Sequence, residues 1–139
     1  MPKASALILC LLFASAAAAE NVVWTSATGV SVSGNSLTKT GSAGWNAGAI
    51  STQQLSWGPV YVEFTAAETN TSRACGLSKG NTDNNYTDID FAIYLSGGTV
   101  YVQEGATTRF TGSAYTTGDK FRVEAEPGVV RYRVNGAVI

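Results

Sequence analysis

The sequence contains no histidine, and only 14% of its residues are charged. Histidine is the commonest general base and the commonest protein ligand of transition metals, so its absence argues against both kinds of site. Acidic and basic residues nearly balance and leave a net charge of -1. Without a basic stripe that could neutralise phosphates, nucleic acid is not an expected partner.

The N-terminus is typical of a secretory signal. Lys3 precedes a short apolar run over residues 6–13, and three alanines at 17–19 suit cleavage by a signal peptidase. The apolar run is too short to span a bilayer. We therefore expect a signal peptide over residues 1–19 and one secreted or cell-surface domain over residues 20–139, with no membrane partner after cleavage.

Cysteine is scarce. Cys10 lies in the signal, so Cys75 is the only cysteine of the expected mature chain and cannot form an internal disulfide. Its neighbours, Ala74 and Gly76, are small and uncharged. Because no histidine is present to activate it, we expect Cys75 to be a small buried hydrophobic residue and not a nucleophile.

Apolar and polar residues alternate along both halves of residues 118–136. A period of two in successive runs predicts an antiparallel hairpin with one buried face. The expected apolar pairs are Phe121 with Val134, Val123 with Tyr132, and Ala125 with Val130. Glu124 then faces Arg131 on the other side. Because L-proline before glycine suits a two-residue hairpin turn poorly, we expect a four-residue loop over residues 126–129.

Residues 88–104 predict a second hairpin around Gly97 and Gly98, which can adopt the positive φ angles of a type I′ turn. This register sets Tyr94 opposite Tyr101 on one face. The other expected pairs are Ala92 with Gln103 on that face, and Leu95 with Val100 and Ile93 with Val102 on the opposite face.

Short strands separated by turn residues continue through the rest of the chain, and no stretch has helical periodicity. The expected strands cover residues 22–25, 29–33, 37–40, 49–55, 60–65 and 74–78. Many short strands with regular turns predict an all-β, antiparallel β-sandwich or barrel. The expected core contains Phe64, Phe91, Ile93, Leu95, Val100, Val102, Phe121, Val123, Tyr132 and Val134, and Trp24 is also expected to be core.

Several short motifs occur in a familiar order. They are Tyr61-Val62-Glu63-Phe64, then Cys75-Gly76-Leu77-Ser78, then Gly118-Asp119 opening a strand, and Asn135-Gly136 ending its partner. This order resembles the concanavalin A-like lectin/glucanase superfamily, and within it a SPRY-like or bacterial secreted lectin-like domain. The resemblance implies a jelly-roll β-sandwich with a recognition function.

The sequence departs from that pattern after Asn135-Gly136, where a SPRY-like domain continues into further strands. Only three residues follow, ending at Ile139. We expect a domain that is truncated at its C-terminus relative to the pattern and has an open strand edge. That edge would be filled by self-association with another chain or covered by residues 22–25, or it would promote aggregation.

Glucanases of the resembled superfamily carry an E-x-D-x-x-E run, which places two carboxylates about 5 Å apart for retaining hydrolysis. The sequence has no such run. Glu63 and Glu104 lie on different expected strands, and a chance pairing of these two would be the remaining route to catalysis. We therefore expect no enzymatic activity and no catalytic residues.

Sugars are held by aromatic rings together with amides and carboxylates that form hydrogen bonds with the sugar hydroxyl groups. The outward face of the second hairpin offers Asp90, Tyr94, Tyr101 and Gln103 as a candidate ligand-binding site. A simpler interpretation is that the two tyrosines form a cross-strand pair that stabilises the sheet.

An alternative loop site consists of Trp45, Asn46 and Trp57. The expected partner is therefore a glycan, with a cell-surface protein as the alternative if the domain is an adhesive or protein-binding SPRY-like module. Aromatic side chains on a sheet face would favour sugar, and aromatic side chains on loop tips would favour protein.

Oxygen-bearing residues are dense between positions 83 and 90, namely Asp83, Asn84, Asn85, Asp88 and Asp90. Calcium takes six to eight oxygen ligands. The order does not match an EF-hand, and aspartate and asparagine are common in turns for backbone reasons. We therefore expect a polar turn, with no metal and no cofactor.

Overall fold

The computed structural model describes residues 19–55 and 58–139. The predicted signal, except for Ala19, and Trp57 of the predicted loop site lie outside the described residues. The chain is all-β, and its one described helical element is a 3₁₀ turn, η1 (Tyr86–Asp88). Within the described ranges, no helix has the length and apolar character needed to cross a bilayer.

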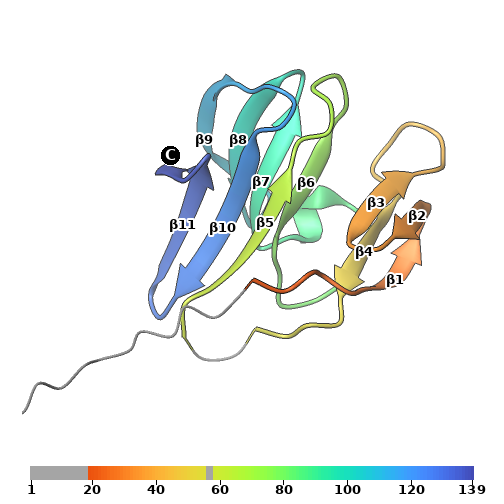
Figure 1. The fold of residues 1–139 in the computed structure, drawn as a ribbon, viewed down its shortest axis with the longest axis horizontal. Coiled ribbons are helices and arrows are strands. Elements are labelled where there is room, and N and C mark those ends of the chain that lie inside the picture. The colour runs from red at the N-terminus through yellow and green to blue at the C-terminus, as the bar shows by residue number, and fades with distance from the viewer. Residues whose placement is uncertain (1–18, 56–57) are drawn as a thin grey trace, which may run out of the picture.

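Two four-stranded antiparallel sheets pack against each other in a sandwich-like body (Figure 1). The β10 sheet has the order β12-β11-β10-β5, with β5 (Val60–Thr65), β10 (Lys120–Glu126), β11 (Val129–Val134) and β12 (Ala137–Val138). The β7 sheet has the order β6-β7-β8-β9, with β6 (Arg73–Leu77), β7 (Phe91–Ser96), β8 (Thr99–Glu104) and β9 (Thr107–Ala114).

The hydrophobic core lies between these two sheets, as the alternating pattern predicts. Seven of the ten predicted core residues are buried, and Phe64, Phe91 and Val134 are partly buried and pack against them. Ala66 and Tyr115 complete the buried cluster. Because side chains of a strand point alternately to its two faces, the same strands also present a polar or aromatic outer face.

Both predicted hairpin registers are confirmed. Phe121 pairs with Val134 across β10 and β11, and the glycines at 97 and 98 have φ angles of 56° and 76°, as a type I′ turn requires. The four-residue loop predicted over residues 126–129 is wrong, because Glu126 pairs with Val129 and leaves only Pro127-Gly128 between the strands. Gly128 has a φ of 81°, and proline followed by such a glycine is the sequence of a type II turn.

Residues 19–55, here called the N-terminal lobe, form two small two-stranded sheets beside the sandwich (Figure 1). One sheet pairs β1 (Trp24–Thr28) with β4 (Gly48–Ser51), and the other pairs β2 (Val30–Ser33) with β3 (Ser36–Lys39). None of the residues described in this lobe is buried. The expectation that Trp24 is core is therefore wrong: it is partly buried, and its Nε1 donates to the Asn35 carbonyl at 2.9 Å.

The C-terminal residues are more closed than the sequence predicted. β12 pairs with β11 through Arg133 and Val134, and the Ile139 amide donates to the Tyr132 carbonyl at 3.0 Å. Residues 22–25 do not cover this edge, because Trp24 pairs with Ser51 of β4 instead. Self-association through the remaining open edge stays a prediction.

Candidate ligand-binding face

Four aromatic rings meet over the outer face of the β7 sheet. This aromatic cluster consists of Trp45, Tyr86, Tyr94 and Tyr101, all partly exposed. Tyr94 is central: its ring centroid lies 4.9 Å from that of Tyr86, with nearly parallel planes, 5.5 Å from Trp45 and 5.6 Å from Tyr101. Such separations are typical of favourable aromatic pairs.

The hairpin of β7 and β8 positions two of these rings. Its register sets Tyr94 opposite Tyr101, which confirms the predicted cross-strand pair. On the other side of β7, the partner of Tyr94 is Ala74 of β6, a small residue. Tyr86 comes from η1, where the Asn85 side chain accepts a hydrogen bond from the Thr87 amide and caps the turn.

Trp45 reaches the cluster from the N-terminal lobe. Lys39 holds the loop that carries Trp45 on both sides of the tryptophan. Its Nζ donates to the Gly44 carbonyl and, at 2.8 Å, to Asn46 Oδ1. Lys39 is the only lysine or arginine between residues 19 and 72. The single cation of this long stretch thus fixes the two residues that flank Trp45.

The structure brings together parts of both predicted sites. Tyr94 and Tyr101 of the face site and Trp45 of the loop site belong to one aromatic cluster, while Asn46 is held by Lys39 beside it. Tyr86 was missed by the sequence analysis, because it lies in a turn-rich loop without periodicity. Only its tertiary placement reveals its role.

The two polar residues predicted beside the tyrosines of the face site are engaged within the fold. Gln103 is only 5% exposed, and its Nε2 donates to Thr108 Oγ1 at 2.8 Å. The structure therefore corrects the expectation that Gln103 is offered to a ligand on the outward face, since its side chain is buried. Asp90 Oδ2 accepts from the Lys79 amide at 2.8 Å and so holds the loop between β6 and β7.

The acidic loop before β7 is likewise held by its own backbone. Asp88 Oδ2 accepts from the Thr82 amide at 2.8 Å, and Asp83 Oδ1 accepts from the Asn85 amide at 2.7 Å. In the part of the chain that the structure describes, no three acidic or cysteine side chains are grouped as metal ligands would be. The oxygen atoms noted in the sequence stabilise a turn.

The two carboxylates considered for catalysis have separate partners. Glu63 lies on the outer face of the β10 sheet, where Oε2 accepts from Arg122 at 2.8 and 3.0 Å. Glu104 Oε1 accepts from the Tyr132 hydroxyl at 2.9 Å, and Arg109 Nε lies 3.4 Å from its Oε2. Burial and the bond to Glu104 both raise the pKa of Tyr132, which remains a neutral donor. Each of these two carboxylates therefore has its own arginine as an ion-pair partner.

Cys75 lies on β6 opposite Ile93. Burial raises the pKa of its thiol to about 11, so the thiol is protonated at neutral pH. A protonated thiol is a poor nucleophile, in line with the structural role expected, although Cys75 is partly and not fully buried.

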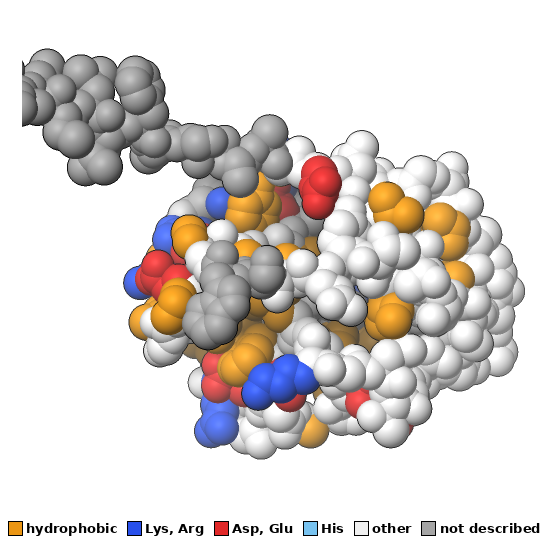
Figure 2. Space-filling view, turned by 90° about the horizontal axis from the view of Figure 1, so that it is seen from below, with side chains coloured by type: hydrophobic (Ala, Val, Ile, Leu, Met, Phe, Trp, Pro, Cys, Tyr) orange, Lys and Arg blue, Asp and Glu red, His pale blue; other side chains and the backbone are white. Residues whose placement is uncertain are grey.

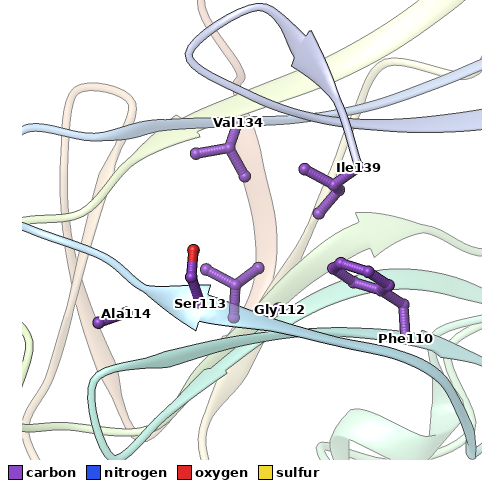
Figure 3. Close-up of a pocket in the computed structure, with 7 residues that line it drawn as sticks. Phe110, Gly112, Ser113, Ala114, Val134 and Ile139 are labelled. Atoms are coloured by element: carbon purple, nitrogen blue, oxygen red, sulfur yellow. The ribbon is translucent and has the colours of Figure 1, made fainter.

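A small hollow lies on the opposite side of the molecule from β5 and β6, between β9 and the end of β11 (Figure 3). Its volume is about 100 Å³, and its lining consists of Val100, Phe110, Gly112, Ser113, Ala114, Val134 and Ile139. Sites for small-molecule ligands usually measure about 300–1,000 Å³. The hollow is therefore large enough for a single side chain and too small for a sugar chain.

Charge is unevenly distributed over the surface. In Figure 2 the charged side chains gather mainly over the sandwich, whereas the N-terminal lobe, on the right, is almost entirely uncharged. The sequence agrees, because Glu20 and Lys39 are the only charged residues between 19 and 55. The aromatic cluster lies where this uncharged lobe meets the β7 sheet.

No family model, curated protein or solved structure matches the chain.

Proposed function

We propose that the chain is a secreted, non-catalytic recognition domain that binds carbohydrate through the aromatic cluster. The observation that carries this proposal is the gathering of four partly exposed rings on an outer sheet face. Aromatic rings beside polar groups are the usual composition of small-ligand sites. The resemblance to concanavalin A-like lectins with a SPRY-like jelly roll supports the same function, and two facing antiparallel sheets are compatible with that fold.

Tyr101, which pairs with only one other ring of the cluster, is the best candidate for sugar contact. The Tyr94 ring is stacked on Tyr86 and flanked by Trp45 and Tyr101, so its faces are largely used within the protein. Tyr101 has its second neighbour on β9, where it pairs with Thr111. A tyrosine face beside a threonine hydroxyl can contact a pyranose ring and one of its hydroxyl groups.

Two observations favour recognition over hydrolysis. Glu63 and Glu104 lie on different sheets, and each is paired with an arginine of its own sheet. Glycoside hydrolysis needs two carboxyl groups that flank one glycosidic bond. We therefore assign neither residue a catalytic role.

A glycan array with the purified domain (residues 20–139), followed by calorimetric titration of the strongest ligand, tests the proposal. Tyr101→Ala and Trp45→Ala should each weaken binding about fivefold or more, since an aromatic contact contributes on the order of 1 kcal/mol beyond the area it buries. Tyr132→Phe is the control, because Tyr132 lies between the sheets and bonds to Glu104. Full affinity in folded Tyr101→Ala and Trp45→Ala variants would contradict the proposed site.

The alternative function is a protein-binding or adhesive surface module, as in many SPRY-like domains. The same array separates the two functions. A folded, monodisperse domain that binds no glycan at millimolar concentration would favour the protein-binding alternative.

A further inference from the structure

The aromatic cluster lies in surroundings that offer few free cations. Lys39 is the only lysine in the sequence of the N-terminal lobe, and its ammonium already donates to Gly44 and Asn46. The four strands of the β7 sheet carry two cations, Arg73 and Arg109. Arg73 pairs with Glu68, and Arg109 lies 3.4 Å from a Glu104 oxygen.

The loop that supplies Tyr86 is acidic. Residues 79–90 contain three aspartates, at positions 83, 88 and 90, against one cation, Lys79. Asp83, Asp88 and Asp90 accept hydrogen bonds from backbone amides, which are uncharged donors. The local charge beside the cluster is therefore negative.

The sheet positions next to the central tyrosines are uncharged. Along β7, Tyr94 has Ala92 and Ser96 as its neighbours on the same face, and along β8, Tyr101 has Thr99 and Gln103. Across the strands, their partners are Ala74 and Thr111. These neighbouring positions offer hydroxyl groups to a ligand and no charged side chain.

These three features disfavour an anionic ligand for separate physical reasons. A carboxylate or sulfate brought against the rings would lose water without gaining a cationic partner. It would meet the negative faces of the aromatic rings, and it would be repelled by the aspartates of the neighbouring loop.

We propose that the aromatic cluster selects neutral glycans and rejects those that carry uronic acid, sialic acid or sulfate groups. This inference rests on the proposed carbohydrate-binding function and names the class of sugar that the site accepts. Neutral sugars offer apolar C–H faces to the rings and hydroxyl groups to Thr111 and Thr99, and they require no counter-charge.

Matched pairs of immobilised oligosaccharides test the inference. Cello-, laminari-, manno- and galacto-oligosaccharides are each compared with their C6-carboxylated forms at about 20 mM and about 500 mM NaCl. Interactions between charges are weakly screened at the lower salt concentration and strongly screened at the higher one. The neutral member should bind at least about tenfold more tightly at low salt, and the difference should narrow at high salt. Equal or tighter binding of the carboxylated member overturns the inference while the carbohydrate-binding function stands. Absence of binding to every member overturns both.

A positive charge introduced beside Tyr101 tests whether the selection against carboxylated sugars arises at the aromatic cluster. Thr111 is exposed on β9 opposite Tyr101, so Thr111→Lys should raise the affinity for the carboxylated member relative to that for the neutral member about fivefold or more, roughly 1 kcal/mol. Thr65→Lys, at an exposed position of β5, is the matched control. An equal gain in both variants would show that net charge and not the aromatic cluster governs the selection, which overturns the inference.

Discussion

The outer faces of the two sheets are built on the same alternating pattern but carry opposite chemistry. On the β10 sheet, the outward positions carry three ion pairs, Glu63–Arg122, Glu124–Arg133 and Glu126–Arg131. Arg122 also lies over the Tyr61 ring, 4.1 Å from its centroid. On the β7 sheet the outward positions carry tyrosines, small residues and hydroxyl groups.

The charged side chains on the outer face of the β10 sheet form ion pairs with one another. Each of its glutamates has an arginine on a neighbouring strand or across the same hairpin, and a partly exposed ion pair of this kind contributes on the order of 0–1 kcal/mol. The aromatic face still offers apolar ring surface to a partner. On the proposed function, recognition belongs to the aromatic face, whereas the charged side chains of the other face are paired with one another.

The ion pairs of the charged face also refine the sequence prediction. Glu124 is in register with Arg131, as predicted. Its hydrogen bond, however, comes from Arg133 at 2.8 Å, and Arg131 bonds to Glu126. Diagonal neighbours on paired strands are within reach of long side chains, so a correct register does not by itself identify the ion pairs.

The largest expected effect comes from breaking the sheet beneath the aromatic face. A Cβ atom at Gly76 would lie 1.9 Å from the Phe91 carbonyl oxygen and 2.7 Å from the Ala92 Cα. Both are backbone atoms of β7, so they cannot move aside without disrupting the β6–β7 pairing. Gly76→Ala should therefore lower the free energy of unfolding by about 3 kcal/mol or more.

Urea unfolding followed by circular dichroism measures this loss. Gly80→Ala is the matched control, because a Cβ there meets no atom within 4 Å, and it should change stability by less than about 0.5 kcal/mol. A Gly76→Ala variant as stable as the control would show that β6 does not pair with β7 as described.

Much of the sandwich was predictable because period-two patterns encode both register and burial. The pairing of Tyr94 with Tyr101, the core and both hairpin registers follow from that pattern. Strand β9 was missed because seven of its eight residues are exposed. A strand without a buried face shows no alternation, and only the β-propensity of its threonines could have indicated it.

The candidate site was less predictable because it depends on contacts between distant segments. Trp45 and Tyr94 are separated by nearly fifty positions, and no local pattern predicts that a loop of the N-terminal lobe packs on β7. The burial of Gln103 has a similar origin, because alternation assigned it to an outer face that the fold covers. Pairing rules identify which residues share a face but not what covers it.

A smaller effect should follow from releasing Trp45 from the aromatic face. Lys39→Met removes the ammonium that bonds to Gly44 and Asn46, and we expect a loss of about 1 kcal/mol in stability. More specifically, the near-ultraviolet circular dichroism that arises from Trp45 beside Tyr86 and Tyr94 should decrease. Lys39→Arg should retain most of this signal, and Lys79→Met, which changes another exposed lysine, should leave it intact. An unchanged near-ultraviolet spectrum in Lys39→Met would show that Trp45 keeps its place without the lysine.

The smallest effect is expected on the charged face. The hydrogen bond from Arg133, opposed in part by desolvation, holds the pKa of Glu124 below its usual range. Such a lowered pKa stabilises the fold above the pKa of the unfolded chain, about 4.3, and the contribution disappears as pH falls through the folded value. Glu124→Gln should therefore cost about 0.5 kcal/mol at pH 7 and less at pH 3. Urea unfolding of both proteins at the two pH values measures the difference, with Glu20→Gln, outside the sheets, as the control. A cost that is as large at pH 3 as at pH 7 would mean that Glu124 acts through packing and not through its charge. The description of the outer β10 face as a set of ion pairs that stabilise the fold would then be wrong.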